Sequence, residues 1–136
     1  MVFCMKLLND QQFLASGGND NSIKIWNLKS GACVSTIEDA HTECVNNLQI
    51  LSSNRLVSCS DDFSIKVWDL NSLECVQTLL GHSNIVICVR VLSVNKLISG
   101  SRDNTIKVWS LETGECLHTL EEHEKSVNCI LLTSSI

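Results

Sequence analysis

Three segments of the chain are near-copies of one another, and each closes on a tryptophan. They are SGGNDNSIKIWN, SCSDDFSIKVWD and SGSRDNTIKVWS, with their tryptophans at Trp26, Trp68 and Trp109. The tryptophans lie 42 and 41 residues apart, and an aspartate precedes each of them by six residues. Serines, valines, cysteines and histidines recur in the same phase. Agreement at so many positions establishes an internal repeat.

A repeat of about 40–45 residues that ends near a tryptophan is typical of the four-stranded blade of a β-propeller. In the middle repeat, short apolar runs at 45–51, 55–60, 64–69 and 74–79 are separated by turns of Ser, Asn and Asp, which predicts four strands. We therefore expect an all-β chain without helices. Its blades would span about 1–38, 41–79 and 82–120, and a fourth would start at about 123–136.

Both ends of the chain have the pattern of the inner strand of a blade, at 2–7 and at 127–132. The ends therefore duplicate each other, and we expect an open arc of about three blades plus one extra inner strand. Closed propellers have roughly 4–8 blades. The outermost sheets of an arc would expose apolar faces, which mark interfaces. The chain is then either part of a longer propeller or closes a ring with other copies of itself.

The charge and hydropathy patterns limit the classes of partner. The net charge is −5, which argues against nucleic acid and against anionic membranes. No apolar run approaches the roughly 18 residues that span a bilayer, and the apolar start before Lys6 is short for a signal peptide. We expect an intracellular protein, cytoplasmic or nuclear, with no nucleic-acid or membrane partner.

Eight cysteines are present, but no two have the C-x-x-C spacing of a metal or redox site. Most of them recur once per repeat, in one column at Cys4, Cys88 and Cys129 and in another at positions 33, 75 and 116. Cysteine used in this way is predicted to be a small buried apolar residue. We expect no metal, no cofactor and no disulfide framework, and a reducing compartment.

Serine, histidine and aspartate recur in the combination of a hydrolase triad. The two sets are His41, Ser58 and Asp62 and, one repeat later, His82, Ser99 and Asp103. One active site needs one triad, and no G-x-S-x-G nucleophile turn is present. A hydrogen-bonded structural network is therefore favoured over an enzyme. Replacing Ser58 and Ser99 separates the two interpretations, because a network predicts loss of stability without loss of any hydrolytic activity.

These motifs resemble those of the WD40-repeat family over essentially the whole chain. The matching residues include Gly81-His82, Asp103, Trp109 and the literal Trp68-Asp69 pair. The resemblance implies that the Trp, Ser, His and Asp of each blade form a structural tetrad. Two tetrads are complete, namely His41, Ser58, Asp62, Trp68 and His82, Ser99, Asp103, Trp109. The first repeat supplies only Ser16, Asp20 and Trp26, and the last supplies only His123.

The resemblance also implies a non-enzymatic scaffold that holds a protein or peptide on the face carrying the tight turns after each second strand. The candidate contact residues are Asn19, Asn21, Glu43, Asp61, Phe63, Asn84, Arg102, Asn104 and Lys125. Arg102 resembles the arginines with which F-box WD-repeat proteins hold phosphorylated degrons, and arginine suits bidentate capture of phosphate. The alternatives are a substrate-recognition part of an F-box-type ubiquitin ligase and an incomplete fragment of a larger WD-repeat protein.

Overall fold

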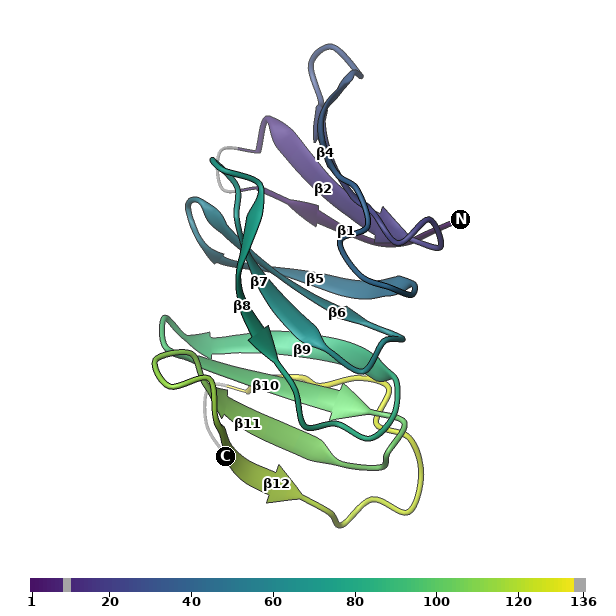
Figure 1. Ribbon diagram of the computed structural model, residues 1–136, viewed down its shortest axis with the longest axis vertical. Helices are drawn as coiled ribbons and strands as arrows, with labels where there is room; N and C mark the ends of the chain where they lie inside the picture. Colours follow the sequence, from purple (N-terminus) through teal and green to yellow (C-terminus); the bar gives the residue numbers. More distant parts are fainter. Residues whose placement is uncertain (9–10, 134–136) are drawn as a thin grey trace.

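The computed structural model of the chain describes residues 1–8 and 11–133, which form three separate four-stranded antiparallel sheets (Figure 1). Each sheet is one blade, and its strands follow one another in chain order. Blade 1 contains β1 (Val2–Leu7), β2 (Phe13–Gly18), β3 (Ile23–Asn27) and β4 (Cys33–Ile37). Blade 2 contains β5 (Val45–Ser52), β6 (Arg55–Ser60), β7 (Ile65–Asp69) and β8 (Glu74–Leu79). Blade 3 contains β9 (Val86–Ser93), β10 (Lys96–Ser101), β11 (Ile106–Ser110) and β12 (Cys116–Leu120).

The predicted fold class is confirmed. The described residues contain strands and turns but no helix, and the three sheets stack one upon the next without closing into a ring (Figure 1). The expected strands of the middle repeat fall within one or two residues of the observed ones.

The core lies between the blades, because successive residues of a strand point to opposite faces of its sheet. Ile65 and Val67 of β7 pack in one cluster with Trp109 of blade 3. Trp68, next along the same strand, packs in the other cluster with Ile25 of blade 1. Blade 2, the central blade, is therefore apolar on both faces, and among the described residues blades 1 and 3 each have one neighbouring blade.

The expectation of an inner strand at 127–132 is wrong, since this segment forms no strand. It lies against blade 3, where Val127 N–H donates to Ser101 O at 2.9 Å and Val127 and Ile130 pack on Cys88. An inner strand pairs with the second strand of its own blade, and the described residues contain no such strand for it. The last three residues of the expected fourth blade, 134–136, lie outside the described residues.

The expectation that the repeated cysteines are buried is confirmed at Cys88 and wrong at most other positions. In the first column Cys4 is half-buried and Cys129 is exposed, and Cys59, which lies in neither column, is buried. All three cysteines of the second column, at positions 33, 75 and 116, are exposed. Each of these three residues faces a repeat tryptophan at a β-bulge on the outermost strand. There its thiol donates to the carbonyl two residues later at 3.2–3.5 Å. All eight thiols are free.

Candidate functional site: the tetrads and the turn face

A chain of short hydrogen bonds joins the four predicted residues in blade 2. His41 Nδ1 lies 2.8 Å from Asp62 Oδ2, and His41 Nε2 lies 2.7 Å from Ser58 Oγ. Trp68 Nε1 donates to the same Ser58 oxygen at 2.8 Å. Since a carboxylate only accepts, the His41 Nδ1–H donates to Asp62, and Nε2 accepts from the Ser58 hydroxyl. The network is thereby complete from the turn to the indole.

Blade 3 repeats this network. His82 Nδ1 lies 2.7 Å from Asp103 Oδ2, and His82 Nε2 lies 2.7 Å from Ser99 Oγ. Trp109 Nε1 donates to Ser99 Oγ at 2.8 Å. In both blades the serine hydroxyl is fully buried, and its proton and one lone pair are committed to the network. It therefore has the contacts of a core residue and no access for a substrate.

A hydroxyl two residues after the aspartate is a further member that the sequence argument missed. Ser64 Oγ donates to Asp62 Oδ1 at 2.6 Å, and Thr105 Oγ1 donates to Asp103 Oδ1 at 2.7 Å. The signal was available, because Ser22, Ser64 and Thr105 recur in phase. These hydroxyls satisfy the second oxygen of each buried carboxylate, as burial of a charge requires.

The two carboxylates stay ionised in their networks. Burial raises the pKa of Asp62, but the hydrogen bonds from His41 and Ser64 outweigh it and hold the pKa well below its usual value. Burial likewise opposes the Thr105 and His82 hydrogen bonds at Asp103, whose pKa falls to about 2. Burial lowers the pKa of His82, against the opposing hydrogen bond of Asp103. In blade 3 the resting state is thus a neutral imidazole that donates to a carboxylate.

The network also ties the loop before each inner strand to the tight turn of the same blade. Thr42 N–H and Ser83 N–H donate to Asp62 and Asp103 at 3.2 and 3.0 Å. The tetrads thereby fix the end of the blades where the partner-contact candidates lie. We call this end, formed by residues 19–21, 61–63 and 102–104 with the adjoining loops, the turn face.

Blade 1 lacks the histidine of the tetrad. Trp26 Nε1 donates to Ser16 Oγ at 2.8 Å, as in the other blades. Asp20, however, forms an ion pair with Lys24 at 2.8 Å, and this hydrogen bond lowers the pKa of Asp20. Ser22 Oγ is buried and has no hydrogen-bond partner among the described residues. These residues line a cavity of about 250 Å³, which we call the socket.

The turn face carries an unusual backbone conformation at the third residue of each turn. Asn21, Phe63 and Asn104 have φ angles of 60°, 70° and 69°. Asparagine adopts this left-handed region more readily than other non-glycine residues, and Asn21 and Asn104 each donate to a carbonyl of the next loop. Phe63 has no such polar group and is 43% exposed.

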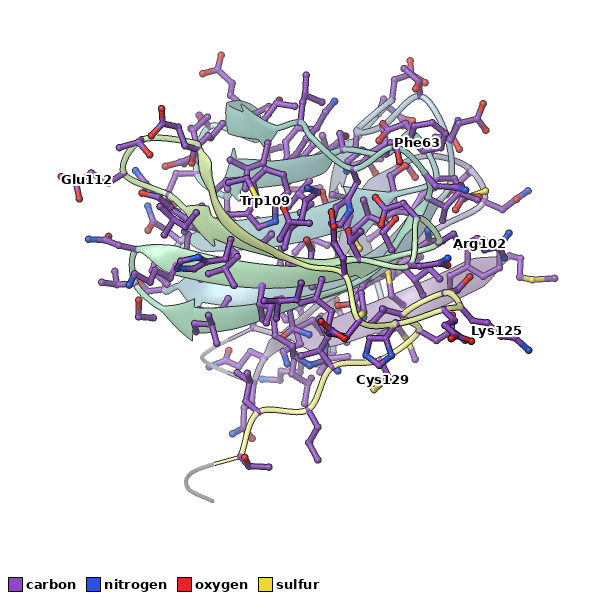
Figure 2. All side chains as sticks on the ribbon, turned by 90° about the horizontal axis from the view of Figure 1, so that it is seen from below. Phe63, Arg102, Trp109, Glu112, Lys125 and Cys129 are labelled. Carbon is purple, nitrogen blue, oxygen red and sulfur yellow. The ribbon has the colours of Figure 1, made fainter. Side chains whose placement is uncertain are left out.

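The remaining candidate contact residues differ in whether their side chains already form hydrogen bonds within the protein. Asn19 accepts from the Cys44 thiol at 3.1 Å, and Asp61 accepts from Asn46 at 2.7 Å. Asn84 is half-buried, and its side chain accepts from its own loop at Ile85 N–H. Glu43, Arg102 and Lys125 are exposed. Figure 2 shows Phe63, Arg102 and Lys125 toward the same end of the blades, away from Glu112.

Asn46 is a second residue that the sequence argument missed. Its amide donates both to Asp61 and to Val86 O, at 2.7 and 3.0 Å. It therefore joins blade 2 to blade 3 beside the turn face. Its in-phase residues in the first and third repeats are Phe3 and Ile87, and only Asn128, after the third repeat, has the same amide, so the repeat pattern did not mark it.

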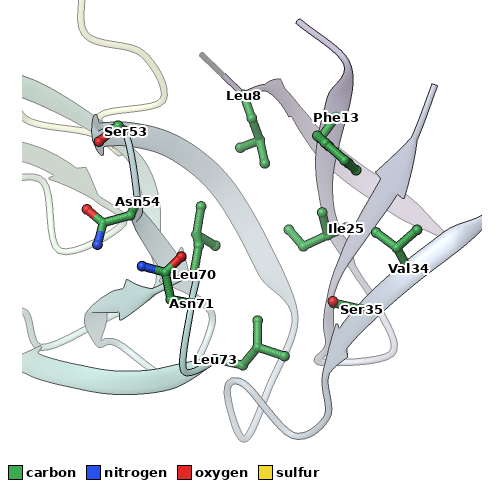
Figure 3. A pocket seen from close by; sticks show the side chains of 10 residues that line it. All are labelled: Leu8, Phe13, Ile25, Val34, Ser35, Ser53, Asn54, Leu70, Asn71 and Leu73. Atoms are coloured by element: carbon green, nitrogen blue, oxygen red, sulfur yellow. The ribbon is translucent and has the colours of Figure 1, made fainter. Parts of the chain in front are cut away.

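A second hollow lies away from the turn face, between blades 1 and 2. It has a volume of about 430 Å³, and Figure 3 shows Leu8, Phe13 and Val34 on one side of it, opposite Leu70 and Leu73. The corresponding place between blades 2 and 3 is spanned by Gln77, whose amide donates to Leu111 O at 3.2 Å. The residue in phase with Gln77 is Ser35, which is too short to span the gap.

The described residues contain no cluster of three or more His, Cys, Asp or Glu side chains that could hold a metal ion. They also include no helix long and apolar enough to cross a membrane.

Comparisons with known proteins agree with the repeat pattern. A family model described as "WD domain, G-beta repeat" matches residues 1–27, 31–69, 73–110 and 114–135. The chain is similar to Periodic tryptophan protein 2 of Arabidopsis thaliana, with 40% identity over 53 residues. That match covers 39% of this chain and 6% of the relative.

Among solved structures, the fold is similar to the WD40 β-propeller domain of Doa1. The TM-score is 0.87 at 24% identity, and the match covers 93% of this chain and 43% of the other. The chain thus spans less than half of the propeller that it matches. At this identity the likeness establishes the fold and not the partner.

Proposed function

Because the chain belongs to the WD40-repeat family, whose propeller domains are generally non-catalytic scaffolds for protein interaction, we propose that its turn face binds a protein or peptide partner. The observation that carries the proposal is Phe63, an exposed aromatic residue in a left-handed turn.

The conformation of Phe63 is unfavourable for the fold alone. A left-handed backbone costs an ordinary residue about 1–2 kcal/mol, and the in-phase residues Asn21 and Asn104 avoid much of this cost and add a hydrogen bond. Strained backbone that stability does not require is concentrated at functional sites. An exposed aromatic ring on a rigid frame is also a typical anchor of an interface. We therefore place Phe63 at the centre of the contact.

The surroundings of Phe63 define the partner more closely. Arg102 is exposed on the neighbouring turn, and Lys125 is exposed on the loop beyond it. An apolar side chain next to acidic groups on the partner would complement this surface. A phosphorylated peptide, held as a substrate of an F-box-type ubiquitin ligase would be, is the narrower alternative, and Arg102 is the observation that favours it.

The test is a peptide-display selection against the purified chain, followed by titration of the selected peptides. We expect Phe63→Asn to weaken binding at least tenfold, as loss of a buried aromatic anchor does. The matched control is Val94→Asn, because Val94 is 70% exposed on the turn between β9 and β10, at the opposite end of β10. Equal loss in both variants, or none in Phe63→Asn, would contradict the proposal.

The phosphopeptide alternative has its own test. Phosphorylated and unphosphorylated forms of one selected peptide are compared on the wild type and on Arg102→Gln. A preference for phosphate that disappears in the variant supports the alternative. Equal affinity of both forms for the wild type rejects it and leaves the general scaffold function.

Two further proposals follow, one from the open arc and one from the free cysteines. Its outer faces are apolar, and we propose that additional blades cover them, either from a longer WD-repeat chain of which this is a part or from further copies. We also propose an intracellular location, cytoplasmic or nuclear, since eight free thiols suit a reducing compartment. An acidic chain of net charge −5 is not expected to bind nucleic acid or anionic membranes.

A further inference from the structure

The face of blade 1 that points away from blade 2 repeats a face that the other blades bury. The in-phase sets are Met5, Leu14, Trp26 in blade 1, Leu48, Leu56, Trp68 in blade 2 and Val89, Leu97, Trp109 in blade 3. In blades 2 and 3 all six side chains are at most 4% exposed, because the preceding blade covers them. In blade 1, Met5 is 64% exposed. Blade 1 thus presents a blade-binding face that no described residue of another blade covers.

The outer face of blade 3 is the matching half of that interface. The in-phase sets are Ile23, Ile25, Ile37 in blade 1, Ile65, Val67, Leu79 in blade 2 and Ile106, Val108, Leu120 in blade 3. Ile37 and Leu79 are 7% and 1% exposed, whereas Leu120 is 46% exposed. The chain builds one kind of interface twice and carries its two unused halves at opposite ends.

The socket of blade 1 has the chemistry to receive an imidazole. In blade 2 the histidine stands between the tryptophan-bonded serine and the turn aspartate, within 3.1 Å of Ser64 Oγ. The corresponding residues in blade 1 are Ser16, Asp20 and Ser22. They line the cavity of about 250 Å³, and the buried Ser22 hydroxyl has no partner among the described residues.

His123 is the in-phase histidine that fills no socket. It follows β12 as His41 follows β4, and it is exposed. The residue before it, Glu122, is in phase with Ala40. The Ala40 carbonyl accepts from Lys66 at 2.9 Å. Lys24, in phase with Lys66 and now bonded to Asp20, is placed to make the same bond to a Glu122 carbonyl.

The segment after His123 already lies where the inner strand of a next blade belongs. A Cβ on Gly17 would lie 2.6 Å from Val45 Cγ1 of β5, and a Cβ on Gly100 would lie 2.7 Å from Val127 Cγ1. Cys4 and Cys88 donate to the carbonyls of Val45 and Val127, respectively. The segment 127–132 is therefore seated on blade 3 as β5 is seated on blade 1, and it lacks only a second strand to pair with.

We propose that two copies of the chain associate head to tail, with His123 of each copy in the socket of the other. The segment 127–132 then pairs with β2 of the partner and displaces the partner's β1, with which it shares the pattern of valine and cysteine. Residues 2–7 and 127–132 share the pattern of an inner strand and are alternatives for one place beside β2. β1 suits displacement, since four of its six residues are exposed.

Two copies are the number that closes the ring. They supply six blades, within the range of roughly 4–8 found in closed propellers. The inference develops the proposal that further blades complete the arc, and it does not depend on the turn face. Unchanged peptide binding in Phe63→Asn with an intact pair would overturn the partner proposal alone.

The test is sedimentation equilibrium of the purified full chain over a range of concentrations. We expect the wild type to reach twice the monomer mass, and His123→Ala to raise the dissociation constant of the pair about ten- to a hundredfold. The control is Glu112→Ala, which removes an exposed side chain from the turn between β11 and β12 and should not change the constant. A monomeric wild type, open-ended larger assemblies, or equal effects of the two variants would overturn the proposal.

Mixing two variants tests the specific contact. Asp20→Asn has a damaged socket and an intact His123, and His123→Ala has the reverse. One of the two interfaces in their mixed pair is intact, so the mixed pair should be tighter than the pair formed by either variant alone. Mixed pairs no tighter than the separate pairs would show that His123 and the socket do not meet.

Discussion

Asn47 and Cys59 face each other across β5 and β6, at the position where the other two blades place a cysteine opposite a glycine. Those pairs are Cys4 with Gly17 and Cys88 with Gly100. In blade 2 the thiol is therefore on the second strand, whereas in blades 1 and 3 it is on the inner strand. There is room for one sulfur only, since a Cβ on Gly100 would lie 2.9 Å from Cys88 Sγ.

This relationship predicts that Cys59→Gly is more harmful than its small size suggests. Cys59 is fully buried, so the change removes a packed thiol and adds backbone freedom, and we expect a loss of about 2 kcal/mol. The double variant Asn47→Cys with Cys59→Gly restores the pattern of blades 1 and 3 and should recover part of this loss. Urea unfolding measures both, and a double variant no more stable than the single one would contradict the interpretation.

Phe63→Asn should stabilise the fold. Asparagine tolerates the left-handed turn, and its amide can reach the Ser83 carbonyl as Asn21 reaches that of Thr42 at 3.2 Å. We expect a gain of about 1 kcal/mol in the free energy of unfolding. Phe63→Ala is the control, because it removes the ring without adding the amide. A variant less stable than the wild type would show that the ring packs and is not strained.

The three tetrad serines should differ in their contribution to stability. Ser58→Ala and Ser99→Ala each leave a buried histidine nitrogen and a buried indole N–H unsatisfied, and we expect a loss of about 2–4 kcal/mol. Ser16→Ala leaves only the half-buried Trp26 indole, and about 1 kcal/mol should be lost. Chemical unfolding of the three variants gives the order. Equal losses would mean that the histidine bond contributes nothing.

The sequence predicted the blades and the tetrads of this molecule, and it missed features that depend on which strands and blades lie next to a residue. Phase alone identified the blades and the residues of the tetrads, because each copy meets the same neighbours. It misjudged 127–132, since pairing depends on a partner strand and not on local pattern. It misjudged Cys33 and its copies, because they lie beside a bulge on the outermost strand of each blade, where they are exposed. Asn46 joins two blades, and the first and third repeats have Phe3 and Ile87 in its place, so the repeat pattern did not mark it.

Acid should destabilise the fold in two stages. The unfolded chain takes up a proton at His82 as the pH falls below about 6.5, while burial lowers the folded pKa, so stability begins to fall there. The pKa of Asp103 is about 2 in the folded protein, against 3.8 for an unperturbed aspartate. A second loss of stability therefore follows as the pH falls from about 4 toward 2. Asp62 acts in the same direction.

Urea unfolding between pH 7.5 and 3 measures this dependence, and Asp103→Asn is the comparison. The variant is less stable at neutral pH, but its second loss should be smaller because one titrating carboxylate is absent. A wild-type stability that is flat between pH 7 and 5, or that rises in acid, would contradict the assigned directions.

The hollow between blades 1 and 2 reflects two positions at which this interface differs from the one between blades 2 and 3. Blades 2 and 3 use Gln77 with Gly114, whose added Cβ would lie 3.2 Å from the Gln77 amide nitrogen. Blades 1 and 2 use Ser35 with Leu73, and Leu73 has a left-handed φ of 60° where its in-phase residues are glycines. Ser35→Gln alone should therefore clash with Leu73, and Leu73→Gly alone should enlarge the cavity.

The double variant should be more stable than the sum of the two single effects predicts. It relieves the backbone at residue 73 and allows the glutamine to reach the Leu70 carbonyl, as Gln77 reaches that of Leu111. We expect a coupling free energy of about 1 kcal/mol in favour of the double variant. A double-mutant cycle in urea measures it. Simple additivity would show that the two positions do not meet and that the hollow has another cause.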